Sequence, residues 1–172
     1  MISLKGYSSE EVINNSAPIV EEGYYQVTLV GYQPAVYNNT TTHKIKWQVV
    51  GAPPHLAAER GKYLYVNWKE DSPAYGKSVL RAGLACGIYS EARIRELIDK
   101  GEMPSPDFES WHNATCVCKV AHNEYNGKVY AIIGTDYYAL DSDTAKEAAI
   151  VFDKSSIEAG KQITPQEDGT PF

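Results

Sequence analysis

The sequence predicts a mainly β protein, a five-stranded barrel with helices between strands 3 and 4 and after strand 5. Three observations predict it: three segments alternate between apolar and polar residues, two helical patterns follow them, and a hairpin signal then joins two further strand patterns. The 172 residues are the usual size of one domain. We expect an irregular leader over 1–22, one domain over 23–153 and a flexible acidic tail over 154–172.

The first three strands are predicted from period-two alternation. Residues 23–32 are rich in β-forming residues, and Gly31 and Pro34 predict a bend of the kind that turns the corner of a small barrel. In the segments 43–50 and 62–69, alternate residues point to opposite faces. The apolar face predicts core positions at Ile45, Trp47, Val49, Leu64, Val66 and Trp68.

Two segments with the apolar spacing of helices follow these strands. Apolar residues recur at that spacing over 75–85, and a second helix begins after the capping residue Ser90 and ends at Gly101. Helix-forming residues over 141–152, after an Asp/Ser cap, predict a final helix.

Two more strands are predicted over 111–121 and 128–134. Asn126-Gly127 lies between them and is the strongest short-range hairpin signal in the chain. Five strands with a helical insertion after the third is the plan of the OB fold, although other small α+β folds share this order. The sequence therefore predicts an OB-like barrel.

Composition restricts the class of protein and its compartment. Hydrophobic residues make up 43% and charged residues 22%, as in soluble globular proteins. An odd number of cysteines, three, favours a reducing compartment. No signal-peptide pattern follows Met1, and no apolar run approaches the roughly 18–20 residues of a membrane-spanning helix. We expect a cytoplasmic protein.

Charge is distributed unevenly along the chain. The net charge of −6 argues against nucleic-acid binding, because such proteins usually carry basic surfaces. However, the net charge is −3 over 1–42, +4 over 43–100 and −7 over 101–172. The basic segment 43–100 contains the second and third predicted strands, so an anion-binding face is most readily expected on these two strands.

The polar face of these two strands combines cations with aromatic rings. Proteins that hold single-stranded nucleic acid place cations along the phosphates and stack rings on the bases, whatever the base. Tyr32 and Tyr37 are possible extensions of such a face. The predicted DNA-binding residues are Lys44, Lys46, Arg60, Lys62, Tyr63, Tyr65, Lys69, Lys77, Arg81 and Tyr130. Tyr and Lys are also common on the solvent face of antiparallel strands. The residue types alone are therefore equally compatible with an ordinary solvent-exposed surface that binds nothing.

The last residues form an acidic segment that ends in Pro-Phe. Glu167 and Asp168 can steer the segment toward basic partners and compete with DNA for a basic groove. A terminal Phe supplies a ring for an apolar pocket and a carboxylate for a basic rim. We expect Glu167, Asp168, Pro171 and Phe172 to recruit partner proteins.

This tail resembles that of single-stranded DNA-binding proteins of bacteria and their phages, which end in an acidic tail closed by a hydrophobic residue. In the bacterial proteins that residue is Phe after Pro, and their acidic run is usually longer than the one here. The body is similar to phage-encoded single-stranded DNA-binding proteins of the OB class in the stretches 23–27, 46–49, 80–87, 116–120 and 124–130. The resemblance implies binding with little sequence preference, in replication, recombination or repair, inside a bacterial host.

No metal site, cofactor or catalytic site is predicted. His112, Cys116, Cys118 and His122 share one face of a strand, but the two histidines would lie roughly 33 Å apart, too far for one tetrahedral site. Cys116 and Cys118 are expected in the core. The chain has no phosphate-binding glycine loop, nucleophile elbow or His-Glu-x-x-His motif, and its four histidines have no partner placed by spacing.

Two other functions remain open at this point. The negative net charge favours a protein-interaction module, in which an OB-like barrel offers its strand face or edge to a protein and binds no nucleic acid. The third is an enzyme whose site the motifs do not reveal, although we expect none.

Overall fold

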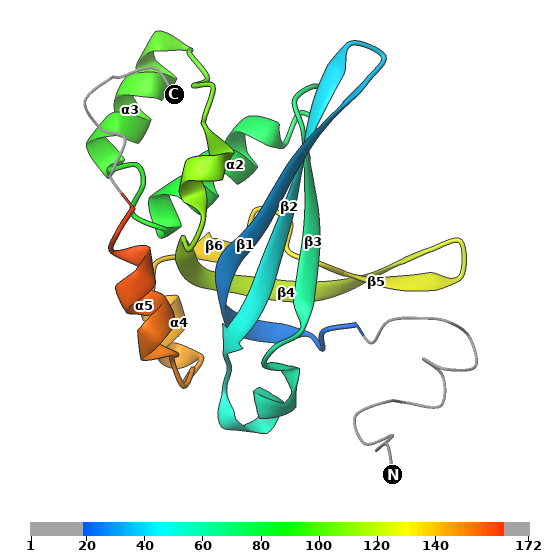
Figure 1. The fold of residues 1–172 in the computed structure, drawn as a ribbon, viewed down its shortest axis with the longest axis vertical. Coiled ribbons are helices and arrows are strands. Elements are labelled where there is room, and N and C mark those ends of the chain that lie inside the picture. Colours follow the sequence, from blue (N-terminus) through cyan, green and yellow to red (C-terminus); the bar gives the residue numbers. More distant parts are fainter. Residues whose placement is uncertain (1–18, 164–172) are drawn as a thin grey trace.

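The computed structural model describes residues 19–163. The sheet is antiparallel, its strands follow the hydrogen-bonded order β3-β2-β1-β4-β5, and β6 also pairs with β4. In Figure 1, β1, β2 and β3 run upright, β4 and β5 cross them, and the helices α2 to α5 lie along one side. The strands are β1 Gly23–Tyr37, β2 Thr40–Gly51, β3 Tyr63–Lys69, β4 Thr115–Tyr125, β5 Lys128–Ile132 and β6 Tyr137–Tyr138.

The prediction of a mainly β protein with helical insertions is confirmed, but the predicted five-stranded barrel is wrong in two respects. The described sheet has six strands, and it is open, because β3 and β5 stand at the two ends of the hydrogen-bonded order. The strand predicted over 128–134 ends at Ile132, where the chain turns through Gly134 at φ 62° and returns as β6. A strand of two residues is too short to show alternation in the sequence.

The bend predicted at Gly31 is present. The first half of β1 pairs with β4 over 23–28, and β1 pairs with β2 from Gln26 to its end. The register with β2 shifts between Leu29 and Gly31. This bulge lets one strand serve two parts of the sheet that run in different directions (Figure 1).

Tight turns with positive φ close two hairpins. Asn38 and Asn39 have φ of 50° and 64° between β1 and β2, and Asn126 and Gly127 have φ of 53° and 76° between β4 and β5. The hairpin predicted at Asn126-Gly127 is confirmed. Between β1 and β2, two Asn residues that tolerate left-handed backbone are sufficient to join the strands.

The two central helices agree with the prediction. α2 spans Tyr75–Ala85 and α3 spans Glu91–Lys100. The Ser90 hydroxyl accepts a hydrogen bond from the Arg93 N–H at 3.1 Å, and Gly101 ends α3 at φ 66°. Of two short 3-10 helices, η1 Pro54–Glu59 precedes β3, and η2 Phe108–Trp111 precedes β4. Because Trp111 belongs to η2, β4 starts four residues later than predicted.

The prediction for the C-terminal part is wrong in extent. Instead of one helix over 141–152, the chain forms α4, Asp143–Glu147, and then α5, Lys154–Gly160, where the flexible tail was expected to begin. Ala149 at φ 55° separates them. Residues 1–18 of the predicted leader and residues 164–172 of the predicted tail lie outside the described residues.

Long-range contacts explain the interruption between α4 and α5. Val151 forms a bridge with Ala52, to which its N–H donates a hydrogen bond at 2.9 Å. The Gln26 amide donates to the Asp153 carbonyl at 3.2 Å and accepts from the Asp153 N–H at 2.6 Å. These contacts join residues about a hundred positions or more apart in the sequence. The spacing of residues within the segment 141–152 therefore could not predict them.

One main core lies between the sheet and α2. It includes five of the six predicted positions, Ile45, Trp47, Val49, Leu64 and Trp68, while the sixth, Val66, packs against it half-buried. Cys116 and Cys118 are fully buried there, as expected, and burial raises the pKa of both thiols. Among residues 19–163, none of the helices has the length and apolar character that crossing a membrane requires.

Candidate nucleic-acid interface

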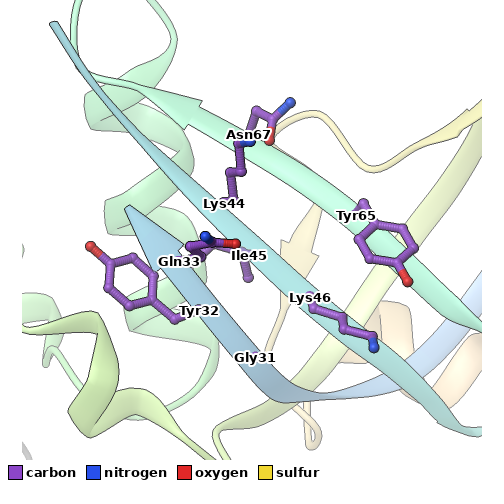
Figure 2. A pocket seen from close by; sticks show the side chains of 8 residues that line it. All are labelled: Gly31, Tyr32, Gln33, Lys44, Ile45, Lys46, Tyr65 and Asn67. Atoms are coloured by element: carbon purple, nitrogen blue, oxygen red, sulfur yellow. The ribbon is translucent and has the colours of Figure 1, made fainter. Parts of the chain in front are cut away.

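The outer face of β1, β2 and β3 contains a hollow of about 430 Å³. Figure 2 shows its walls, with Lys46 and Tyr65 close together on one side and Lys44 beside Asn67 on the other. The hollow is lined by Gly31, Tyr32, Gln33, Lys44, Ile45, Lys46, Tyr65 and Asn67. Three neighbouring strands therefore contribute both rings and cations to one surface.

Strand register explains this composition. Lys46 pairs with Tyr65 on β3 and with Gly31 on β1. Lys44 likewise pairs with Asn67 on one side and Gln33 on the other. Each lysine thus lies between a residue of β1 and a residue of β3, in one row across three strands. Gly31 and Gln33 lie in these rows because the bulge before Gly31 shifts the register of β1 against β2.

Gly31 leaves space beside Lys46. A Cβ atom added to Gly31 would lie 3.3 Å from the Lys46 Cβ and 3.6 Å from its Cδ. Glycine inside a strand commonly marks such a close approach. Gly31 and Gln33 were not among the predicted site residues, and the only signal in the sequence was the glycine that predicted the bend.

The ammonium group of Lys46 lies close to the rings of two exposed tyrosines. Its Nζ lies 4.1 Å from the centre of the Tyr63 ring and 5.8 Å from the centre of the Tyr65 ring, within reach of a cation–π interaction. Tyr63 is 45% exposed and Tyr65 is 70% exposed. The rings therefore point into solvent, as the alternation predicted, and are not part of the core.

Three lysines on this face have no acidic partner among the described residues. Within residues 19–163, Lys44, Lys46 and Lys69 belong to none of the ion pairs. Lys62 differs, because its Nζ lies 2.7 Å from the buried carboxylate of Glu59. An ammonium group without an acidic partner can pair with a phosphate without first breaking a salt bridge.

Seven of the ten predicted residues do not line the hollow, and four of these seven lie on other parts of the fold. Arg60 follows η1, where its Nε donates to the Val50 carbonyl at 3.0 Å. Lys77 and Arg81 are on α2 and line a separate hollow against α3. Tyr130 is on β5, with the Lys128 Nζ 5.4 Å from its ring centre.

The other candidates are also placed apart. Tyr37 is exposed at the tip of the β1–β2 hairpin. Glu167, Asp168, Pro171 and Phe172 lie outside the described residues. The structure thus brings together Lys44, Lys46, Tyr63 and Tyr65, with Lys69 further along the same face of β3.

A part-buried hydrogen-bond network lies behind the hollow and gives His43 two partners that spacing along the sequence did not place. Its Nδ1 lies 2.8 Å from the Tyr32 hydroxyl and its Nε2 lies 2.8 Å from a carboxylate oxygen of Glu70. Because a carboxylate can only accept, Nε2–H donates to Glu70, and in neutral His43 the Tyr32 hydroxyl donates to Nδ1. The three residues come from β1, β2 and the end of β3, so only pairing of the strands brings them together.

Tyr32 belongs to this hydrogen-bond network and also lines the hollow. Burial raises the pKa of Tyr32, and the carboxylates of Glu109, Asp107 and Glu70 raise it further. The phenol is therefore held in its protonated form, which suits a hydrogen-bond donor and not a nucleophile.

No metal centre is found in the described part of the chain. Over residues 19–163, His, Cys, Asp and Glu form no group of three or more that could hold a metal ion. His122, one of the residues weighed for zinc, has its Nε2 at 2.7 Å from the Val20 carbonyl.

Comparison with known proteins identifies no family for this chain. The sequence matches no protein-family model. It also finds no significant match among curated proteins. The function is therefore argued from the geometry and charge of the β1–β3 face.

Proposed function

We propose that the chain is an OB-like protein that binds single-stranded DNA with little sequence preference, in support of DNA replication, recombination or repair. The observation that carries the proposal is the ammonium group of Lys46 between the exposed rings of Tyr63 and Tyr65. Stacking surfaces and cations without acidic partners are the two elements that single-strand binding needs. The strand order, with α2 and α3 inserted between β3 and β4, supports the OB-like assignment.

Stacking explains why a single strand is the expected ligand. Unpaired bases can offer their faces to Tyr63 and Tyr65, and each stacked base contributes about 1–3 kcal/mol whatever its identity. In a duplex these faces are covered by neighbouring base pairs. When DNA binds, the Lys46 ammonium exchanges its contact with the Tyr63 ring for a phosphate, so that the ring becomes free to stack.

The polar groups of the hollow fit a ligand of variable sequence. Gln33 and Asn67 each carry an amide, which offers both a donor and an acceptor. Such groups can meet the edge of any base, so they add hydrogen bonds without strict selection. Lys44, opposite Asn67, and Lys69, further along the same face of β3, supply the charge for further phosphates.

The tail has a separate part in the proposal. Glu167, Asp168, Pro171 and Phe172 recruit replication or recombination proteins through their acidic and aromatic side chains. This assignment depends on the sequence alone.

Salt-titrated fluorescence anisotropy with a labelled oligonucleotide and with its duplex tests the DNA-binding proposal. We expect tighter binding to the single strand, and an affinity that falls as salt rises, with a slope of log K against log salt of roughly −2 if three lysines each meet a phosphate. An affinity that does not depend on salt would contradict the phosphate contacts. No binding to DNA at low salt, with measured binding of a protein at the same face, would select the interaction module that the net charge of −6 favours.

A further inference from the structure

A second hollow lies between α2 and α3, away from the β1–β3 face. Its volume is about 320 Å³, and it is lined by Lys77, Leu80, Arg81, Leu84, Ile94 and Ile98. Four of the six are apolar, and Ile98 leaves 66% of its surface exposed. An exposed apolar groove of this kind commonly marks a binding surface.

The described chain ends close to this groove. Leu84 lines it and also lines a neighbouring hollow of about 500 Å³, whose wall includes Ile163, the last described residue. The nine residues 164–172 follow directly and reach roughly 30 Å when extended. Leu84 and Lys77 are two turns apart on α2, roughly 10 Å along the helix axis, so the segment is long enough to cover the groove.

The chemistry of the groove is complementary to that of the segment. The cations Lys77 and Arg81 lie on α2, and the segment carries Glu167 and Asp168, followed by the apolar Phe172. Arg81 is held in place, because its Nη2 donates to the Tyr137 carbonyl at 2.6 Å and its guanidinium stacks 5.4 Å from the centre of the Tyr138 ring. A guanidinium that is already ordered loses less conformational entropy when it binds a carboxylate.

We propose that the segment Thr164–Phe172 docks in the α2–α3 groove of its own chain. Glu167 and Asp168 pair with Lys77 and Arg81, and Phe172 covers the apolar wall that contains Leu80 and Ile98. Docking of the tail and recruitment of a partner then exclude each other, because they use the same side chains. The β1–β3 face stays open in both states, since the groove lies on a different surface.

Methyl NMR spectra test this docking. We compare the full chain with a chain that ends at Ile163, and expect shifts of the methyl signals of Leu80, Leu84, Ile94 and Ile98. A peptide of sequence 164–172 added to the shortened chain should restore the signals of the full chain. Ile98→Lys should abolish this response. Ala92→Lys places the same charge at an exposed position of α3 outside the groove, and should leave the response intact.

Other outcomes would overturn the docking. These are identical spectra of the two chains, peptide-induced shifts confined to the β1–β3 face, or an equal response to a peptide carrying Glu167→Lys and Asp168→Lys. Groove signals that shift with protein concentration in the shortened chain would show that a second copy is the occupant instead. Circular dichroism of both variants checks that they fold. Because no DNA is present, failure of the docking leaves the DNA-binding proposal untouched.

Discussion

Tyr63 and Tyr65 contribute little to the core, so their proposed role in binding can be tested separately from stability. We expect Tyr63→Ala with Tyr65→Ala to reduce affinity for single-stranded DNA about 30-fold or more, the equivalent of about 2 kcal/mol for two lost stacking contacts. The thermal midpoint should change little, because the rings are 45% and 70% exposed. Anisotropy and thermal unfolding measure the two quantities.

Tyr125→Ala is the matched control for these rings. Tyr125 is 67% exposed on the β4–β5 hairpin, outside the hollow, and its loss should leave affinity nearly unchanged. Equal losses of affinity in this control, or a large fall in the thermal midpoint of the double variant, would refute the assignment of Tyr63 and Tyr65 as stacking residues.

Lys44 and Lys46 should account for part of the salt dependence. Replacing both by Gln removes two phosphate contacts, so the slope of log K against log salt should become shallower by about 1.4. The control pair Lys146→Gln and Lys154→Gln makes the same change in net charge at exposed positions of α4 and α5. An equally shallow slope in the control pair would mean that DNA responds to net charge and not to this face.

The contact between β1 and the segment before α5 depends on one buried side chain. Gln26 is fully buried and hydrogen-bonds to Asp153 and to the Thr115 hydroxyl. Its replacement by Ala removes these bonds and leaves the Asp153 N–H without its acceptor, so we expect a loss of about 1–3 kcal/mol in the free energy of unfolding. Hydrogen exchange in α5 should become faster.

Gln48→Ala provides the comparison for Gln26. Gln48 is half-buried on β2, and its amide makes one long hydrogen bond of 3.4 Å to the Gly61 carbonyl. Urea unfolding of this variant should differ little from that of the unaltered chain. Unchanged exchange in α5 of the Gln26→Ala variant would contradict the proposed contact.

The elements differ in how far local sequence predicts them. α2 and α3 have the predicted extents because their signals are local: apolar spacing with Gly87 after the end for α2, and the Ser90 cap, apolar spacing and Gly101 for α3. β6, in contrast, is stabilised by pairing with Val117 and Cys118. The C-terminal helix was predicted too long because Val151 pairs with Ala52, a contact that overrides local helix propensity.

Buried tyrosines should make the whole protein sensitive to alkali. Burial, and then the Glu70 carboxylate, raise the pKa of Tyr75 from 10.0 to about 12. Between these pH values the unfolded chain releases the Tyr75 proton while the folded chain keeps it, so stability is complete below pH 10 and falls above it. Tyr75 alone should lower the free energy of unfolding by about 1.4 kcal/mol per pH unit in this range.

Urea unfolding at pH 9, 10 and 11 measures this loss. Tyr75→Phe keeps the ring but has no phenol to titrate, so its stability should fall less steeply between pH 10 and 11. Burial also raises the pKa of Tyr25, Tyr89 and Tyr137, so part of the decline remains in the variant. Identical curves for the two proteins would show that Tyr75 titrates normally in the folded state.

Removal of the tail should separate the two proposed binding functions. A chain that ends at Ile163 keeps every residue of the β1–β3 face, so we expect its affinity for single-stranded DNA to be unchanged or tighter. The loss of Glu167 and Asp168 removes negative charge that can compete with DNA. Weaker binding of DNA by the shortened chain would contradict the proposed role of the tail.

The sequence by itself determined which side chains of β2 and β3 face solvent, because strand geometry sorts alternate residues to opposite sides without help from the rest of the fold. It likewise determined the extents of α2 and α3. Only the tertiary structure decided that Gly31 and Gln33 join Lys44 and Lys46, since the bulge in β1 shifts the register there. It also decided that the sheet stays open and that His43 meets Tyr32 and Glu70, because these depend on how separate strands pair and not on spacing along any one of them.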